Sequence, residues 1–225
     1  MFLTRFQINP ARRRARKLLS SPHAMHAAVR AAFPTAEDYE RPGSRTLWRL
    51  DTPAAATVFL YIVSPGRPDL THLVKQAGWP TQEEAWVSRR YDGLLTSLHA
   101  GQEWAFRLTA NPTHSGRKTA DAKETQRFGY LREPEQIEWL ARRARRHGFT
   151  VSHQQDGRPN LRLHQRQTHT FRRGMGTVTL TTATYDGILQ ITNADAFRHT
   201  LISGIGHAKA YGCGLLTLAP TQATP

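Results

Sequence analysis

Near its C-terminus the chain reads Gly204-Ile205-Gly206-His207-Ala208-Lys209-Ala210-Tyr211-Gly212-Cys213-Gly214, followed directly by Leu215-Leu216-Thr217-Leu218. Glycine has no Cβ and tolerates positive φ, so the N–H groups of such a loop can approach an anion such as a phosphate. Common phosphate-binding loops run from a strand into a helix, whereas this one is predicted to run from a helix into a strand. A tight turn that needs glycine for its own geometry is the alternative, and the pattern alone leaves both open.

The chain is strongly basic. Its 225 residues include 31 lysines and arginines against 17 acidic residues, a formal net charge of +14. This excess predicts a polyanionic partner, for which nucleic acid is the leading candidate and an anionic membrane the second. No apolar run is long enough to span a bilayer, and no basic amphipathic segment carries large apolar residues on its other face. We therefore expect no membrane partner.

Two further features bear on location and chemistry. Residues 1–6 alternate like a strand and lack the apolar core of a signal peptide. The single cysteine, Cys213, provides no disulfide framework and no cysteine-based metal site, and no neighbour in the sequence would activate it as a nucleophile. We expect a soluble cytoplasmic protein without a cofactor, in which Cys213 is a small packing residue.

Strand and helix patterns alternate in the first half of the chain. The predicted elements are a strand at 2–8, a helix at 22–33, strands at 46–50 and 57–63, and a weak helix at 70–76. Residues 80–102 show no regular pattern and are interpreted as the end of the first unit and a linker. The arginine-rich segment 12–17 is interpreted as a basic loop.

The second half repeats this order and adds a hairpin at about 154–173. The predicted elements are a strand at 103–110, a helix at 134–147, strands at 149–153, 160–164 and 177–184, a hairpin turn at Asp186-Gly187 into a strand at 188–192, a helix from the cap Asn193 to about 203, and a strand after the glycine loop.

Each half therefore follows roughly the βαββαβ order of a ferredoxin-like fold, which many RNA-binding modules share. The predicted class is α+β, with two tandem ferredoxin-like (RRM-like) domains. We place the N-terminal domain at 1–90, a linker at 91–102 and the C-terminal domain at 103–225.

The helix predicted at 22–33 carries the candidate catalytic residues. Ser21 followed by Pro22 is typical of a helix start. At about 100° per residue, His23, His26 and Arg30 lie within about 60° of one another, beside the apolar face that contains Met25.

This group of side chains suits RNA cleavage by attack of a 2′-hydroxyl on the adjacent phosphate. Histidine can remove and deliver protons near neutral pH, and arginine supplies positive charge to the crowded phosphate. No H-E-x-x-H motif, cysteine cluster or pair of acids indicates a metal. Two histidines on a surface helix, in a chain with 11, are however more often bystanders than catalysts.

Three stretches of the sequence carry a resemblance to a known family. They are residues 1–12, residues 21–26 (Ser-Pro-His-Ala-Met-His) and residues 204–220. Residues 108–112 and 135–140 fit as well. With these motifs the chain resembles, over nearly its whole length, the CasE family, the CRISPR repeat-processing endoribonucleases of the type I-E Cascade complex.

The resemblance implies metal-independent cleavage of precursor CRISPR RNA at the 3′ base of the repeat stem-loop, leaving a 2′,3′-cyclic phosphate or its hydrolysed form. It also implies a single-turnover enzyme that stays on the hairpin as a Cascade subunit, so its partners would be the repeat stem-loop RNA and other Cascade subunits. His26 matches the family's catalytic histidine. Several relatives have a tyrosine in place of His23, and some have a lysine one turn beyond the histidine, near Arg30. We therefore give His23 and Arg30 auxiliary roles.

The candidate RNA-binding residues are basic or belong to the glycine loop. The basic hairpin is the first candidate for contact with the groove of the stem, as the resemblance implies, and the loop would support RNA close to the cut. The full set is Arg12, Arg13, Arg14, Arg16, Lys17, Arg158, Arg162, Arg166, Arg172, Arg173, Gly206, His207, Lys209, Gly212 and Gly214. On the helix at 134–147, Arg142, Arg143 and Arg146 either line the RNA path or form a solvated face.

Three other functions remain open at this stage. A non-catalytic subunit that holds a hairpin RNA would bind equally well and yield no cut product. A purely structural subunit of a ribonucleoprotein would bind free RNA weakly. A small-molecule nucleotide enzyme is disfavoured by the helix-to-strand order of the glycine loop.

Overall fold

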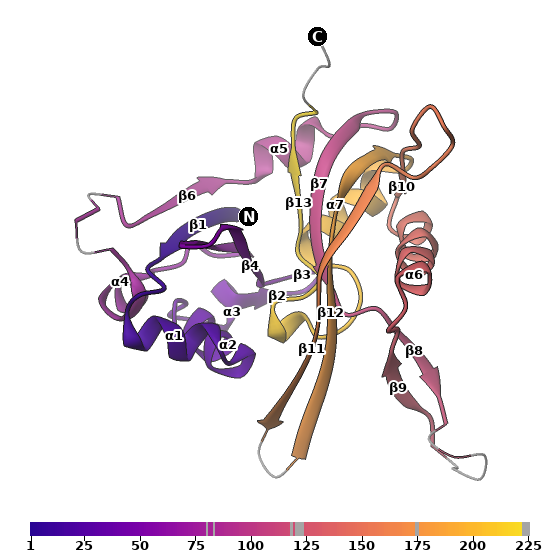
Figure 1. Cartoon of the computed structure of the whole chain (residues 1–225). Helices are drawn as coiled ribbons and strands as arrows, with labels where there is room; N and C mark the ends of the chain where they lie inside the picture. Colours follow the sequence, from indigo (N-terminus) through magenta and orange to yellow (C-terminus); the bar gives the residue numbers. More distant parts are fainter. Residues whose placement is uncertain (80, 83, 118, 120–123, 174–175, 222–225) are drawn as a thin grey trace.

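The computed structural model describes the chain except for residues 80, 83, 118, 120–123, 174–175 and 222–225. The described residues form two units side by side, each built on an antiparallel sheet with helices packed on it (Figure 1). Among these residues, no helix is both long and apolar enough to cross a membrane.

The first unit is a four-stranded antiparallel sheet with the strand order β4-β5-β1-β6. Its elements are β1 (Phe2–Ile8), α1 (Arg13–Leu19), α2 (Pro22–Arg30), α3 (Ala36–Tyr39), β2 (Glu40–Arg41), β3 (Ser44–Arg45), β4 (Leu47–Ala54), β5 (Thr57–Ser64), α4 (Thr71–Ala77) and β6 (Trp86–Arg90). With α2 and α4 as the connecting helices, this is the predicted ferredoxin-like arrangement.

Helix α2 is fixed to this sheet by its apolar face. Met25 and Val29 pack in one cluster with Phe6 and Ile8 of β1, and all four are buried. Ser21 begins the helix as predicted, because its side-chain oxygen accepts a hydrogen bond of 3.2 Å from the Ala24 N–H. The helix ends at Arg30, one turn earlier than predicted.

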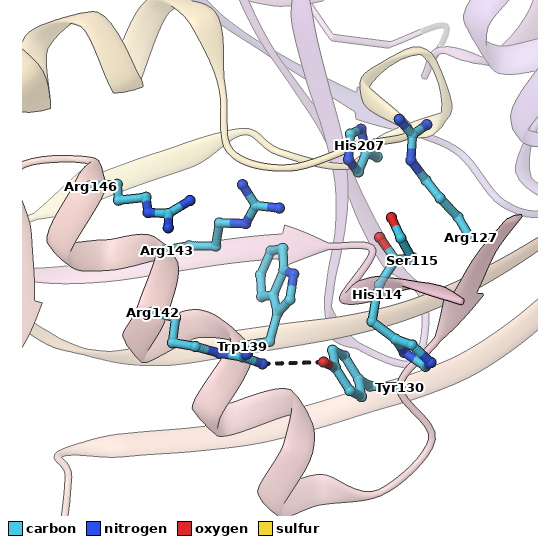
Figure 2. Close-up of a pocket in the computed structure, with 10 residues that line it drawn as sticks. His114, Ser115, Arg127, Tyr130, Trp139, Arg142, Arg143, Arg146 and His207 are labelled. Atoms are coloured by element: carbon cyan, nitrogen blue, oxygen red, sulfur yellow. Dashed lines mark hydrogen bonds between the residues drawn. The ribbon is translucent and has the colours of Figure 1, made fainter. Parts of the chain in front are cut away.

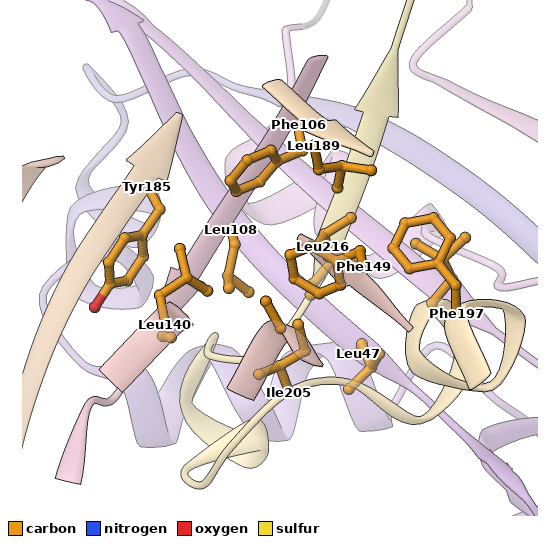
Figure 3. Packing of buried hydrophobic residues seen from close by; sticks show 14 of the residues in the cluster. Leu47, Phe106, Leu108, Leu140, Phe149, Tyr185, Leu189, Phe197, Ile205 and Leu216 are labelled. Atoms are coloured by element: carbon orange, nitrogen blue, oxygen red, sulfur yellow. The ribbon is translucent and has the colours of Figure 1, made fainter. Parts of the chain in front are cut away.

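The second unit is a five-stranded sheet. Four of its strands, in the order β10-β12-β7-β13, repeat the arrangement of the first sheet, and β11 pairs with β12 outside that order. Its elements are β7 (Glu103–Ala110), β8 (Thr113–Gly116), β9 (Gln126–Gly129), α6 (Glu133–Arg146), β10 (Phe149–Val151), β11 (Leu161–Arg173), β12 (Gly176–Ile191), α7 (Ala194–Ser203), the short 3-10 helix η1 (Lys209–Tyr211) and β13 (Leu216–Ala219). Figure 3 shows its core, in which Phe106, Leu108, Phe149 and Phe197 pack together with Leu47 from the first unit.

Two segments predicted to be irregular in fact form helices and a strand. The arginine-rich segment is not a loop, because Ala15 and Leu18 recur on one side and are buried, which makes it helix α1. The stretch 80–102 contains β6, which pairs with β1, and helix α5 (Asp92–Ser97). We keep the division into domains at 91–102 as a proposal, since the first sheet ends at Arg90 and β7 begins at Glu103.

The hairpin turn predicted at Asp186-Gly187 is wrong. Both residues lie inside the continuous strand β12, paired with β7 on one side and β11 on the other. Gly187 is needed there for close approach, because a Cβ would collide with the carbonyl oxygen of Asn160. The additional hairpin is likewise formed by β11 with β12 rather than by residues 154–173, and residues 174–175 between the two strands lie outside the described part of the chain.

The two units are joined by a buried arginine. Arg49 of β4 is 1% exposed. Its guanidinium donates to both carboxylate oxygens of Asp51 at 2.6 and 2.9 Å, and across the interface to the carbonyl oxygens of Arg107 and Leu215 at 2.8 and 3.0 Å. A further bond of 2.8 Å reaches the hydroxyl of Thr217. One side chain therefore holds β4 against β7 and β13.

Replacing Arg49 tests how much this connection stabilises the protein. We expect Arg49→Met to lower the free energy of unfolding by about 3–5 kcal/mol, because Asp51 would lose its closest donor and two buried carbonyl groups would lose theirs. The exposed pair between Arg90 and Asp92 provides the control, since Arg90→Met is expected to cost less than about 1 kcal/mol. Urea unfolding measures both, and equal stability of the two variants would contradict the role given to Arg49.

Candidate functional site

Four elements meet around His26, two from the start of the chain and two from its last third. The half-buried imidazole projects from α2, with its Nδ1 atom 3.5 Å from the hydroxyl of Tyr39 at the end of α3. The ring of Tyr211, from η1, lies 6.4 Å from the imidazole, and the ring of Phe171, from β11, lies 4.9 Å from that of Tyr211. His26 is thus placed at the junction of the two units, beside the β11–β12 hairpin.

The other two predicted catalytic residues lie on the same helix. The guanidinium of Arg30 lies over the ring of Tyr39, 5.2 Å from its centre, so Tyr39 contacts both His26 and Arg30. His23 is exposed on the preceding turn. Burial raises the pKa of Tyr39, against the opposing effect of Arg45 and Arg30, so the phenol keeps its proton at neutral pH.

The glycine loop brings Tyr211 to this place. All four glycines, Gly204, Gly206, Gly212 and Gly214, have positive φ, and a Cβ on Gly212 would come within 2.8 Å of the ring of Trp48. The geometry of the loop thus accounts for its glycines, as the tight-turn alternative expects. Cys213 is fully buried between them, and burial raises its pKa to about 12, as suits a packing residue.

Two cationic side chains, Lys209 and Arg45, flank the site. Lys209 of η1 is half-buried, and burial followed by the charge of Arg45 lowers its pKa. The Nε atom of Arg45 is buried and has no hydrogen-bond partner among the described residues. Two positive groups that repel each other provide a favourable place for an anionic group.

A cavity of about 270 Å³ opens beside Tyr211 and Gly212. Helices α1 and α2 form one wall with apolar side chains that include Leu18 and Met25. The hairpin forms the other wall, and its side chains are mostly polar: Gln165, Gln167, His169, Thr182 and Thr184. The cavity therefore lies between the helix that carries His26 and the hairpin predicted to hold RNA.

The basic residues of the segment 12–17 divide into two groups. Arg12 donates to the carbonyl oxygens of Lys75 and Gly78 at 2.8 and 3.0 Å and so closes the end of α4, and Arg16 donates to the Ala11 carbonyl oxygen at 3.1 Å. The exposed side chains of Arg13, Arg14 and Lys17 have no such engagement among the described residues. We therefore keep these three as RNA candidates and give Arg12 a structural role.

The predicted hairpin arginines are spread more widely than expected. Arg166 fastens β11 to the start of α6 through the side chain of Gln136 at 2.9 Å and the carbonyl oxygen of Leu131 at 2.6 Å. Arg162 is exposed on β11, whereas Arg158 lies in the preceding turn beside Asp156. The backbones of Arg172 and Arg173 end β11, and their side chains lie outside the described part of the structure.

Sequence reasoning missed Tyr39, Phe171 and Arg45. Helix α3 has four residues, too few to show a periodicity, so Tyr39 gave no signal. Tyr211 could have been found, since it stands inside the glycine stretch. Within the described residues no three His, Cys, Asp or Glu side chains gather to hold a metal ion, and the expected metal independence stays a prediction.

Comparison with known proteins gives a consistent result. The family model described as "CRISPR associated protein" matches residues 1–220. The CRISPR-associated endoribonuclease Cse3 of Thermus thermophilus is 28% identical over 228 residues, which cover 98% of this chain and 100% of the relative. The CRISPR system Cascade subunit CasE of Escherichia coli is 30% identical over 184 residues, which cover 77% of this chain and 88% of the relative.

Solved structures agree in fold. Thermus thermophilus Cse3 bound to an RNA representing a pre-cleavage complex superposes with a TM-score of 0.77 at 29% identity, covering 97% of this chain and 98% of the other. Cse3 bound to a 19-nucleotide RNA gives a TM-score of 0.74 at 27% identity and covers 98% and 100%. These matches confirm the mixed architecture of two sheet-based units, and the chain belongs to the CRISPR-associated protein family that includes CasE and Cse3.

Proposed function

We propose that this protein is an endoribonuclease that cleaves precursor CRISPR RNA at the 3′ base of the repeat stem-loop and stays bound as a Cascade subunit. One observation carries the proposal: in a chain that matches endoribonuclease Cse3 over 98% of its length, His26 stands where α2, η1 and the hairpin converge. RNA held along the hairpin would pass this imidazole.

The reaction needs little beyond what these side chains offer. The 2′-hydroxyl oxygen attacks the adjacent phosphorus, the bond from phosphorus to the 5′-oxygen breaks, and a cyclic phosphate and a 5′-hydroxyl result. His26 takes the proton of the 2′-hydroxyl or delivers one to the departing oxygen. Lys209 and Arg45 supply positive charge to the phosphate as its charge builds up.

The remaining residues have supporting roles in this proposal. The phenol of Tyr39 orients His26, and the guanidinium of Arg30 packs over the phenol ring. His23, one turn before His26, is given an auxiliary part in proton transfer. Arg13, Arg14, Lys17, Arg162 and the glycine loop hold the stem through its phosphates, because the major groove of A-form RNA is too narrow for base reading.

We also propose that the protein acts in the cytoplasm. Its one cysteine is buried and unpaired, which fits a reducing compartment. A non-catalytic hairpin-holding subunit is the alternative function, and the fold and the basic surface would serve it equally well. The two functions differ only in whether the RNA is cut.

Cleavage of a stem-loop repeat RNA in excess EDTA is the first test. We expect cutting in EDTA, loss of cutting when the scissile nucleotide is 2′-deoxy, and a roughly 10²–10⁴-fold slower rate for His26→Ala. His99→Ala, which changes an exposed histidine elsewhere, is expected to cut at the normal rate. Tight binding without cutting by the unchanged protein would favour the hairpin-holding alternative.

The auxiliary role of His23 is tested separately. We expect His23→Ala to slow single-turnover cleavage by roughly tenfold while the affinity for 2′-deoxy RNA stays the same, because a proton-transfer group acts on the reaction and not on binding. Cleavage at the normal rate would remove His23 from the mechanism and leave His26 in place.

The contact of Tyr39 with His26 predicts a positioning role. We expect Tyr39→Phe to lower the cleavage rate by roughly tenfold, the value of one hydrogen bond of about 1.4 kcal/mol, without weakening RNA binding. Tyr91→Phe is a matched control, because the hydroxyl of Tyr91 is buried and has no hydrogen-bond partner among the described residues. If both variants cut at the same rate, Tyr39 does not position His26.

A further inference from the structure

A second basic site lies beside the glycine loop, at His207. It is a cavity of about 250 Å³ between α6, the β8–β9 hairpin and the loop. Figure 2 shows its lining, to which six basic side chains contribute: His114, Arg127, Arg142, Arg143, Arg146 and His207. The lining contains no carboxylate. We call this cavity the arginine pocket.

The arginines of the pocket are largely uncompensated. Among the described residues, Arg127, Arg143 and Arg146 take part in no ion pair. Arg142 alone has partners, the carboxylate of Glu138 at 3.7 Å and the hydroxyl of Tyr130 at 3.2 Å. Cations gathered without acids repel one another, and a bound polyanion would relieve that repulsion.

Trp139 adds an unsatisfied donor to the same place. The indole is 3% exposed, and its N–H is buried without a hydrogen-bond partner among the described residues. Figure 2 shows its ring between Arg143 of α6 and Ser115 of β8, and the guanidinium of Arg143 lies 5.9 Å from the ring centre. A buried donor of this kind is expected to have an acceptor, and a phosphate or ribose oxygen would provide one.

The glycine loop connects the pocket to the candidate cleavage site. Gly206 packs on Trp139, where a Cβ would lie 3.0 Å from the indole ring, and His207 then enters the pocket. Burial, and after it the charges of Arg127, Arg143 and Lys209, lower the pKa of His207. Lys209 is two residues further on, at most about 7 Å of extended chain. The pocket and the cleavage site are therefore neighbours on one loop.

We propose that the arginine pocket binds the phosphates of the single-stranded RNA on the 3′ side of the scissile phosphate. This inference rests on the proposed function, in which the cut lies at the 3′ base of the stem. On one side of that cut the RNA is duplex, and only the other side is a flexible strand able to follow the loop. Guanidinium groups bind phosphate through paired hydrogen bonds, and the neighbouring rings of His114 and Tyr130, 4.7 Å apart, offer a surface for a base.

The test compares three RNAs that carry a 2′-deoxy scissile nucleotide and so are not cut. One is the bare stem-loop ending just after the scissile phosphate, one has a short 3′ extension, and one has a short 5′ extension. The variant Arg143→Gln/Arg146→Gln alters the pocket. The variant Arg145→Gln/Arg89→Gln is the control, since it removes the same charge at two exposed arginines away from the pocket.

We expect the 3′ extension to tighten binding by the unchanged protein and the control about tenfold, and the pocket variant to lose this gain. Its affinity for the other two RNAs should stay within about twofold of the control. Two lost phosphate contacts would also reduce the slope of log affinity against log salt by about 1.4 for the 3′-extended RNA. Circular dichroism checks that both variants are folded.

Three results would overturn the inference. An equal loss on all three RNAs, or a loss confined to the 5′-extended RNA, would show that the pocket serves another part of the RNA. Unchanged binding of every RNA would show that it takes none, and an acidic protein surface would then be the candidate. Failure of the unchanged protein to bind even the bare stem-loop would instead contradict the proposed function.

Discussion

The arrangement of this protein depends on a charge buried between two sheets. Arg49 can be buried only because Asp51 neutralises its charge and because carbonyl oxygens of the second unit accept hydrogen bonds from its remaining N–H groups. Beside it, Arg107 is held between Asp186 at 2.6 Å and Asp51 at 3.6 Å, so the same carboxylate serves both units. An arrangement in which every partner must be satisfied allows few relative positions of the sheets.

That fixed position matters because neither unit holds the candidate site alone. His26 and Tyr39 come from the first unit, whereas Tyr211, Lys209 and Phe171 come from the second. A small rotation at the interface would separate the imidazole from the loop. Proton transfer and phosphate binding both require the side chains to be positioned to within about 1 Å. The buried Arg49 contributes to this positioning by fixing the two units relative to each other.

Much of the architecture could be predicted from local chemistry. The caps Ser21 and Asn193 mark their helices correctly, and the alternation in residues 2–8 and 103–110 gives the bounds of β1 and β7. The family resemblance and its implied fold were confirmed by the comparisons. Local patterns succeed here because caps and strand faces are decided by residues close in the sequence.

The failures have a common physical origin in tertiary contacts. Asp186-Gly187 has the composition of a turn, but the glycine is required by the backbone of Asn160, just before β11, which lies too close for a Cβ. The arginines of α1 suggested a loop, although two buried apolar residues were enough to fold them as a helix. The interaction of Tyr39 with His26 depends on where α3 lies, which the sequence does not state. The roles of individual residues in the site remain predictions.

The length of β12 has a consequence for how RNA would be bound. From Gly176 to Ile191 it is one strand, of roughly 50 Å at the usual rise per residue, and its second half pairs with β7 inside the core sheet. The paired strands of the β11–β12 hairpin are therefore continuous with the core sheet, from which they project in Figure 1. Most of the conformational entropy of ordering this arm is lost when the protein folds, before any RNA arrives. RNA would therefore bind to a preorganised surface, and little of the binding free energy would be lost in ordering the protein.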